Sequence, residues 1–253
     1  MRMFKPKTER IQHLVNKDGE TISQLEQLLK GSVHMYIDFA NVRPWATKLG
    51  WHIDAKRLKQ FLDSFDNIKS IKFYVGTLVG DEESERFVRG LKELGYHVTT
   101  KPVKIMEISI DATSVDPQST ALAKQFIRAS LIRHFDVATI EHLNHKFAEM
   151  NAKGVFSIED RKCNFDVEIG RDMLIDYERN HIDTYVLWSG DSDFADPIKQ
   201  LIQDGKNVRL FATARRVSTE LSNLRSLGLF IFDIQKIKDF ICWTKEIGPG
   251  RLG

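Results

Sequence analysis

The segment "TYVLWSGDSDFADPIKQLIQDGK", residues 184–206, decides the fold class of this chain. A short apolar run stops at Asp191 and Asp193, and a helical pattern follows at once and ends at Gly205. A buried strand followed directly by a helix is typical of the units that build a parallel sheet. Two carboxylates about 4 Å apart repel each other by roughly 4 kcal/mol at an effective dielectric constant near 20. The acidic pair therefore needs an explanation other than stability.

The same alternation of strands and helices extends on both sides of this segment. Further apolar strands are predicted in "VHMYIDF" (33–39), "SIKFYV" (70–75), "YHVTTKPV" (96–103), "NVRLFA" (207–212) and "LFIFDI" (229–234), the last as a strand or an extended segment. Helical patterns lie between them at residues 54–65, 83–95, 165–180 and 218–228. We therefore predict an α/β fold with right-handed connections and a central parallel sheet covered by helices on both faces.

Three segments fall outside this alternation. Residues 104–160 contain two stretches with helical spacing joined by polar turns, which predicts a helical insertion. Residues 1–32 form a polar N-terminal extension with one helix, and residues 244–253 form a C-terminal tail. The main domain is accordingly expected to span residues 33–243 and to be interrupted by the insertion.

Composition indicates a globular protein and excludes little else. The chain has 253 residues, of which 42% are hydrophobic and 28% charged, and its net charge of +2 is too small to indicate nucleic-acid binding by itself. Cys163 and Cys242 have no metal-site spacing, and we interpret them as reduced thiols. The charged N-terminus lacks the apolar core of a signal peptide, and no apolar run approaches the ~20 residues that span a bilayer. We expect a cytoplasmic protein without a membrane segment.

Four aspartates are expected to meet at one edge of the sheet. Asp38 ends the first strand, and Asp191 and Asp193 follow the strand at 184–188. Asp166 opens the helix that leads into that strand, and in a right-handed connection this helix begins at the edge where the strands end. Asp172 lies about 240° further around the helix, so it does not share a face with Asp166.

A metal ion is one explanation of this acidic edge. Clustered carboxylates without a paired lysine need protons or a cation, and oxygen ligands without His or Cys favour Mg²⁺ or Mn²⁺. The alternative is local: Asp-Ser-Asp forms turns, while Asp193 and Asp166 are also ordinary residues at helix starts. Asn41, three residues after Asp38, either forms a turn or orients a water molecule.

Three segments in order, "YIDFANV" (36–42), "KCNFDVEIGRDML" (162–174) and "VLWSGDSDFADPIKQLIQDGKNVRLFA" (186–212), resemble the NYN domain family, specifically its LabA-like branch within the PIN-like nucleases. The resemblance covers roughly residues 33–235 apart from the insertion. It implies a PIN-like Rossmannoid fold with the strand order 3-2-1-4-5, which places the Asp38 strand beside the Asp191 strand. It also implies a nuclease that depends on Mg²⁺ or Mn²⁺ and acts on RNA.

The resemblance assigns roles to individual residues. The acids of the family motif match Asp38, Asp166, Asp191 and Asp193, which would ligate the metal and catalyse hydrolysis, and Asn41 matches the asparagine of the first motif. Asp172 matches a further acid that is common in the family. Candidates for contact with the RNA backbone are basic residues near the acidic edge and one hydroxyl at a helix start: Arg43, Lys162, Arg215, Arg216 and Ser218.

Two activities are therefore compared below. The first is a metal-dependent endoribonuclease, and the alternative is a catalytically weak NYN-type module that binds RNA or a protein. In either case the 104–160 insertion offers a surface for a homodimer or for a protein partner. A phosphotransferase of the Toprim or haloacid type also uses acids at strand ends, but the first strand here ends in Asp-Phe-Ala-Asn and lacks both of their motifs.

Overall fold

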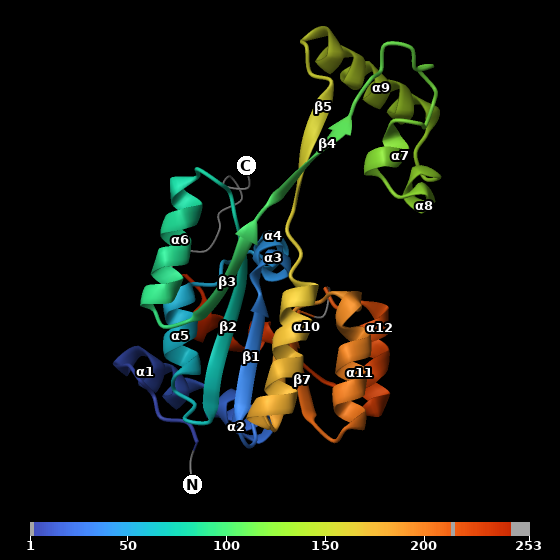
Figure 1. The fold of residues 1–253 in the computed structure, drawn as a ribbon. Helices are drawn as coiled ribbons and strands as arrows, with labels where there is room; N and C mark the ends of the chain where they lie inside the picture. The colour runs from blue at the N-terminus through green and yellow to red at the C-terminus, as the bar shows by residue number, and fades with distance from the viewer. Residues whose placement is uncertain (1–2, 214–215, 244–253) are drawn as a thin grey trace. The chain divides into compact units, whose positions relative to one another are not determined.

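The computed structural model describes residues 3–213 and 216–243, and its contacts divide the chain into two compact units. The larger unit joins Met1–Pro102 to Cys163–Gly253, and the smaller unit is Val103–Lys162. Figure 1 traces the elements of each unit along the chain. The C-terminal tail predicted at 244–253 lies outside the described residues.

The larger unit is built on a parallel sheet with the strand order β3-β2-β1-β6-β7-β8. Its strands are β1 (Val33–Asp38), β2 (Ile68–Thr77), β3 (His97–Pro102), β6 (Thr184–Trp188), β7 (Asn207–Ala212) and β8 (Phe230–Asp233). The predicted α/β class and the order 3-2-1-4-5 are confirmed, with β6 and β7 as the fourth and fifth strands. β8 adds a sixth strand at the edge.

Helices connect these strands, as Figure 1 shows. Those of the larger unit are α1 (Glu9–Lys17), α2 (Gly19–Leu28), α3 (Phe39–Val42), α4 (Ala46–Leu49), α5 (Ala55–Leu62), α6 (Glu82–Glu93), α10 (Asp166–Ile175), α11 (Ala195–Gln203), α12 (Thr219–Asn223) and α13 (Lys238–Ile241). Short 3₁₀ turns lie at η1 (Arg43–Trp45), η3 (Ser192–Phe194), η4 (Leu224–Leu227) and η5 (Ile234–Ile237), and a π-helical turn, η2 (Asp176–Asn180), extends α10. Several begin at a residue whose side chain caps the helix; Asp54, for example, caps α5 through the Arg57 N–H at 2.9 Å.

The two faces of the sheet differ in chemistry. On one face Phe73 of β2 packs against Phe39 and against Phe87 of α6, with ring centroids 4.9 and 6.4 Å apart. This apolar face belongs to a continuous core that also includes Ile11 of α1 and Ile22 of α2. The predicted N-terminal extension thus contains a second helix, α1, and both helices bury side chains in the core of the larger unit.

The other face carries a buried ionic network beneath α10. Asp176 is 1% exposed; its Oδ2 lies 2.8 Å from His34 Nδ1, accepts a bond of 2.8 Å from Lys72 Nζ and also accepts the Tyr36 hydroxyl. Its Oδ1 accepts the Asn180 side-chain amide at 2.8 Å. Burial raises the pKa of Asp176, but these hydrogen bonds outweigh it and hold the pKa well below its ordinary value. Asp176 is therefore ionised at neutral pH.

The smaller unit combines a ribbon of two antiparallel strands with three helices. These are β4 (Lys104–Ser109), β5 (Ser157–Lys162), α7 (Ala123–Phe126), α8 (Ala129–Ile132) and α9 (Val137–Ala152). Its own cluster of buried apolar residues is small and contains Ala123, Ile132 and Ile140. The helical insertion was predicted without β4 and β5, because both strands are largely exposed and lack the apolar pattern of a buried strand.

Within the described ranges, no helix combines the length and the apolar character that crossing a bilayer requires.

We predict that Asp176→Asn weakens the fold and changes its response to acid. Because the folded pKa of Asp176 is depressed, its contribution is complete above the unfolded pKa of about 3.9 and is lost as the pH falls below it. Urea unfolding at pH 7 should show a loss of about 3 kcal/mol or more, the scale for breaking a buried ion pair. Between pH 4 and pH 2 the free energy of unfolding should fall less steeply in the variant than in the wild type.

Asp63→Asn is the matched control for this experiment. It removes an exposed ion pair with Lys59 at 2.6 Å, which is worth no more than about 1 kcal/mol. Parallel acid limbs for Asp176→Asn and the wild type would contradict the assignment of Asp176 as an ionised buried anchor.

Candidate active site

Asp38 lies where β1 ends beside β6. It is 3% exposed, its Oδ1 accepts the backbone N–H of Asn41 at 3.3 Å, and its Oδ2 accepts the hydroxyl of Ser189 at 3.2 Å. Because β1 and β6 are parallel neighbours, their carboxyl ends meet at one edge of the sheet. Strand pairing thus brings Asp38 into contact with a turn 151 residues further along the chain.

The turn from Ser189 to Asp193 is fixed by short-range hydrogen bonds. The Asp191 N–H donates to Ser189 Oγ, and the Asp193 N–H donates to Asp191 Oδ1, each at 3.3 Å. Asn41 reaches over from the first motif, and its Oδ1 accepts the Gly190 N–H at 3.1 Å. These bonds lock the first motif to the acidic turn, so the two aspartates leave β6 in a defined direction.

Gly190 is required because another part of the backbone lies against it. A Cβ built on Gly190 would stand 1.7 Å from the carbonyl oxygen of Arg216, a separation that no side chain can occupy. The Ser218 N–H also donates to the Gly190 carbonyl at 3.1 Å. The segment after β7 is therefore packed directly onto the acidic turn.

Asp166 joins the cluster as the first residue of α10. Its N–H donates to Asn164 Oδ1 at 2.8 Å, which forms the turn into the helix. Burial raises the pKa of Asp166, the bond with Asn164 opposes this, and the charges of Asp191 and Asp193 raise it further. The helix thus brings a carboxylate within electrostatic range of the acidic turn, as predicted.

Among the four acids of the cluster, Asp38 has the pKa that its surroundings change most. Burial raises its pKa to about 6, the hydrogen bonds from Asn41 and Ser189 oppose this, and the charges of Asp166 and Asp191 raise it further. In the described part of the chain no Lys or Arg forms an ion pair with any of the four acids. A nearby cation, Lys101, is bound to Glu168 with both contacts at 2.9 Å. Among the residues that the structure describes, the negative charge of the cluster therefore has no cationic partner.

The chemistry of these ligands fits a hard divalent cation. The four acids offer only oxygen atoms, which is the preference of Mg²⁺ and Mn²⁺. The pKa of Asp38 is raised first by burial and then by the charges of Asp166 and Asp191, and a bound cation would offset both effects. Among the described residues, no three His, Cys, Asp or Glu side chains already converge tightly enough to hold a metal ion. Binding would require the carboxylates to turn inward from the positions seen here.

Asp172 has a different role from the other acids. Its Oδ2 accepts the Tyr74 hydroxyl at 2.8 Å, and its Oδ1 accepts Arg171 Nε at 3.1 Å. The charges that raise the pKa values of Asp38 and Asp166 come from other aspartates. This agrees with the expectation that Asp172 and Asp166 lie on different faces of α10.

The predicted RNA contacts are only partly placed by the structure. Arg43 is exposed in η1, just beyond Asn41, and Arg216 and Ser218 lie in the segment packed on Gly190. The Ser218 hydroxyl accepts the Leu221 N–H and so caps α12. Lys162 belongs to the smaller unit, where its Nζ lies 3.7 Å from Asp160. Arg215 lies outside the described residues.

Sequence reasoning did not identify Ser189, Gly190 or Asp176 as residues that position the acids. Ser189 and Gly190 were part of the recognised Ser-Gly-Asp motif, so the motif itself was a signal for them. Asp176 gave no such signal, because its partners come from β1, β2 and the turn after α10.

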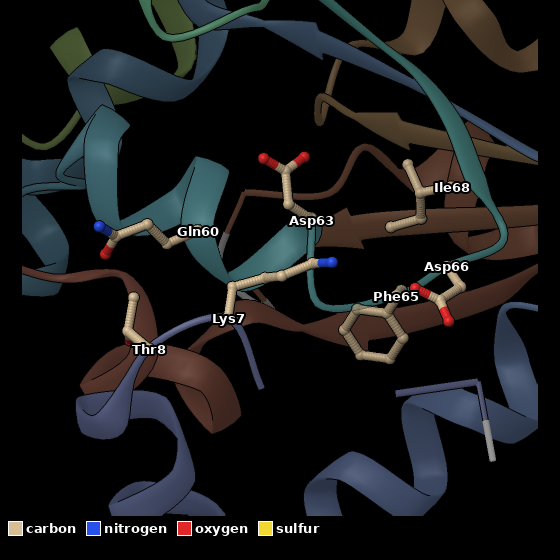
Figure 2. Close-up of a pocket in the computed structure, with 7 residues that line it drawn as sticks. All are labelled: Lys7, Thr8, Gln60, Asp63, Phe65, Asp66 and Ile68. Carbon is tan, nitrogen blue, oxygen red and sulfur yellow. The ribbon is translucent and has the colours of Figure 1, made fainter. Parts of the chain in front are cut away.

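A surface pocket lies far from the acids along the strands. It is lined by Lys7, Thr8, Gln60, Asp63, Phe65, Asp66 and Ile68 (Figure 2). Ile68 begins β2, whereas the acids follow the ends of β1 and β6. The pocket is therefore at the opposite edge of the sheet and contributes nothing to the candidate site.

We predict that Asp38→Asn stabilises the metal-free protein. A carboxyl group whose folded pKa is raised from 3.8 to about 6 costs stability as the pH rises between these values, and the cost is complete above pH 6. Thermal unfolding at pH 7.5 should show a gain of up to about 3 kcal/mol, which shrinks towards zero near pH 4. A variant less stable than the wild type at pH 7.5 would contradict the raised pKa assigned to Asp38.

We predict that Gly190→Ala disrupts the acidic turn. The new methyl group must displace the Arg216 backbone, and we expect a loss of about 2 kcal/mol or more in urea unfolding. Gly170→Ala in α10 is the matched control, because its Cβ meets nothing within 4 Å and alanine favours a helix by roughly 0.5–1 kcal/mol. Equal stability of the two variants would show that the segment after β7 does not press on Gly190.

The chain is similar to known proteins in sequence and in fold. The family model described as "NYN domain" matches residues 112–230, a range that contains Asp166, Asp191 and Asp193. The chain is 24% identical over 216 residues to the low amplitude and bright protein LabA of Synechococcus elongatus, covering 85% of this chain and 90% of LabA.

A crystal structure of a protein of unknown function from Vibrio parahaemolyticus has a similar fold. It matches with a TM-score of 0.50 and 17% identity, and the match covers 84% of this chain and 96% of that one. The family match and the similarity to LabA agree with the resemblance seen in the sequence motifs. Residues 112–230 of this chain thus match the NYN domain family, and the similarity to LabA supports the LabA-like branch.

Proposed function

We propose that this protein is a metal-dependent endoribonuclease that hydrolyses phosphodiester bonds of RNA at Asp38, Asp166, Asp191 and Asp193. The observation that carries the proposal is the burial of Asp38 among other acids without a cationic partner in the described chain, which raises its pKa to about 6. Strongly perturbed titratable groups that cluster at strand ends are typical of functional sites. The NYN match supports the same class of activity.

The four acids would hold Mg²⁺ or Mn²⁺ through carboxylate oxygens. A bound ion of this kind supplies an activated water and stabilises the charge that develops on a phosphoryl group during in-line displacement. Asp38 is the least mobile of these ligands, since both of its oxygens are hydrogen-bonded and the residue is buried. Asp193 is exposed and so has the most freedom to turn towards the ion.

Asn41 would act through the end of its side chain. Its carbonyl oxygen is occupied by the Gly190 N–H, so its NH₂ group is the part that can contact the attacking water or a phosphate oxygen. Arg43, Arg215, Arg216, Ser218 and Lys162 remain the proposed contacts to the RNA backbone. The support for Arg216 is specific, because its Nε is buried without a hydrogen-bond partner in the described structure. A phosphate oxygen would satisfy this donor.

A second candidate function is a catalytically weak module that binds RNA or a protein. It is favoured by one observation, namely that no three acids of the described chain are arranged to hold a metal ion. The smaller unit would then provide the contact surface, for a homodimer or for another protein. It exposes several large apolar side chains, including Ile105, Leu131 and Phe156.

Two further predictions accompany the proposal. The domain boundaries stay as predicted from the sequence, with the NYN domain at 33–243 and the insertion at about 104–160. A cytoplasmic location stays a prediction as well.

The test is cleavage of labelled single-stranded and hairpin RNA in Mn²⁺. We expect products with a 5′-phosphate and a 3′-hydroxyl, and no products in EDTA. Asp191→Asn should lower the rate by about two orders of magnitude or more, the scale seen when a group that stabilises developing charge is removed. Products ending in a 2′,3′-cyclic phosphate would contradict hydrolysis by this mechanism.

Asp196→Asn is the matched control. Asp196 is exposed in the first turn of α11, three residues beyond Asp193, and it does not contribute to the perturbed pKa values of the cluster. This variant should cleave at the wild-type rate. RNA binding that survives both EDTA and Asp191→Asn, without cleavage by the wild type, would favour the binding module.

A further inference from the structure

Two tyrosine hydroxyls hold the helix that presents Asp166 to the sheet, in addition to the ion pair between Lys101 of β3 and Glu168. Asp172 accepts the hydroxyl of Tyr74 from β2, and Asp176 accepts the hydroxyl of Tyr36 from β1. Tyr36 and Tyr74 are both fully buried. Each bond joins the charged side chain of a helix residue to a side chain that the sheet holds rigidly.

These two points lie on one side of the helix and Asp166 lies on another. At 100° per residue, Asp172 and Asp176 are about 40° apart around the axis, whereas Asp166 is about 80° from Asp176. Along the axis, Asp166 stands about 9 Å beyond Asp172 and about 15 Å beyond Asp176. Two anchors at different heights oppose both sliding and rotation of the helix, and with the Lys101–Glu168 ion pair they fix where its first residue stands.

Tyr74 also connects this anchor to the acidic cluster directly. In the register of the sheet it is the partner of Asp38, one strand away and on the same face. The Tyr74 ring lies 6.0 Å from the ring of Phe165, the residue just before Asp166. A shift of Tyr74 or of the helix would therefore change the separation of Asp38 and Asp166.

We propose that Tyr36 and Tyr74 are positioning residues, which fix α10 through Asp176 and Asp172 and thereby hold Asp166 in place for the metal. This inference rests on the proposed function only for the metal, and the tethering of the helix can be measured without it. Outer contacts that orient metal ligands usually change metal affinity 10- to 100-fold when they are removed.

The sheet supplies an internal control in Tyr185 of β6. Tyr185 is fully buried on the same face, with its ring stacked 6.1 Å from that of Tyr36 at an interplanar angle of 4°. Its hydroxyl has no hydrogen-bond partner among the described residues. Tyr185→Phe therefore removes the same atom from a similar position without removing a tether.

The experiment compares Tyr36→Phe, Tyr74→Phe and Tyr185→Phe, each of which keeps the buried ring. Hydrogen–deuterium exchange of the metal-free protein reports the tether, and calorimetric titration with Mn²⁺ reports the effect on the site.

In Tyr36→Phe and Tyr74→Phe we expect backbone amides in the first turns of α10, such as that of Ile169, to exchange about tenfold faster or more. Amides of α11 should keep their wild-type rates. Mn²⁺ should bind these two variants at least about tenfold more weakly, and Tyr185→Phe should match the wild type in both measurements.

Other results would overturn the inference. Unchanged exchange in α10 would show that the hydroxyls do not tether the helix, and an equal acceleration in α10 and α11 would show that they serve general stability alone. Faster exchange confined to α10 with unchanged Mn²⁺ affinity would show that the tether does not position Asp166. If the wild type itself binds no Mn²⁺, the proposed metal site fails, and the exchange rates still decide whether the two tyrosines fix the helix.

Discussion

The pairing of β1 with β6 is the constraint on which the site depends. These strands are separated by more than half of the chain, and their parallel arrangement brings both carboxyl ends to one edge. The Ser189 hydroxyl then reaches Asp38, and the Asn41 side chain reaches Gly190. Without this pairing, each acidic motif would be an ordinary turn or helix cap. With it, Asp38 is buried near the charges of Asp166 and Asp191, and its burial followed by these charges accounts for its raised pKa.

Such an arrangement works against the stability of the fold. A buried carboxylate among like charges disfavours the folded state, and it persists only if the surrounding structure is strong enough to hold it. Here three independent sets of contacts hold the acidic turn. They are its own hydrogen bonds, the bond from Gly190 to Asn41 and the packing of the Arg216 backbone on Gly190. Geometry of this kind is characteristic of sites whose charge is completed by a ligand, and the donor atoms here suit a hard cation.

Beneath α10, the larger unit uses charge for a different purpose. Asp176 is as buried as any core residue, yet it is satisfied by His34, Lys72, Tyr36 and Asn180. A buried ionic group whose hydrogen bonds are all made favours one packing arrangement, because translation or rotation of the helix would break those bonds. The same sheet face therefore carries two kinds of carboxylate: Asp38, which forms no ion pair with a described residue, and Asp176, whose partners anchor the helix that presents Asp166.

The sequence by itself determined the α/β class, because that class follows from local patterns. The strand order came from the resemblance to NYN domains, and the four acids of the site were predicted from their places at strand ends and at a helix start. Apolar strands, helix starts and the Ser-Gly-Asp turn can each be recognised from a short run of consecutive residues. The β4–β5 ribbon had no such pattern, since both strands are largely exposed. Only the tertiary structure decided that Asp172 bonds to Tyr74, that Asp176 anchors α10, and that Gly190 lies against Arg216. Each of these contacts joins residues far apart in the chain, and their distances are set by how the helices pack on the sheet.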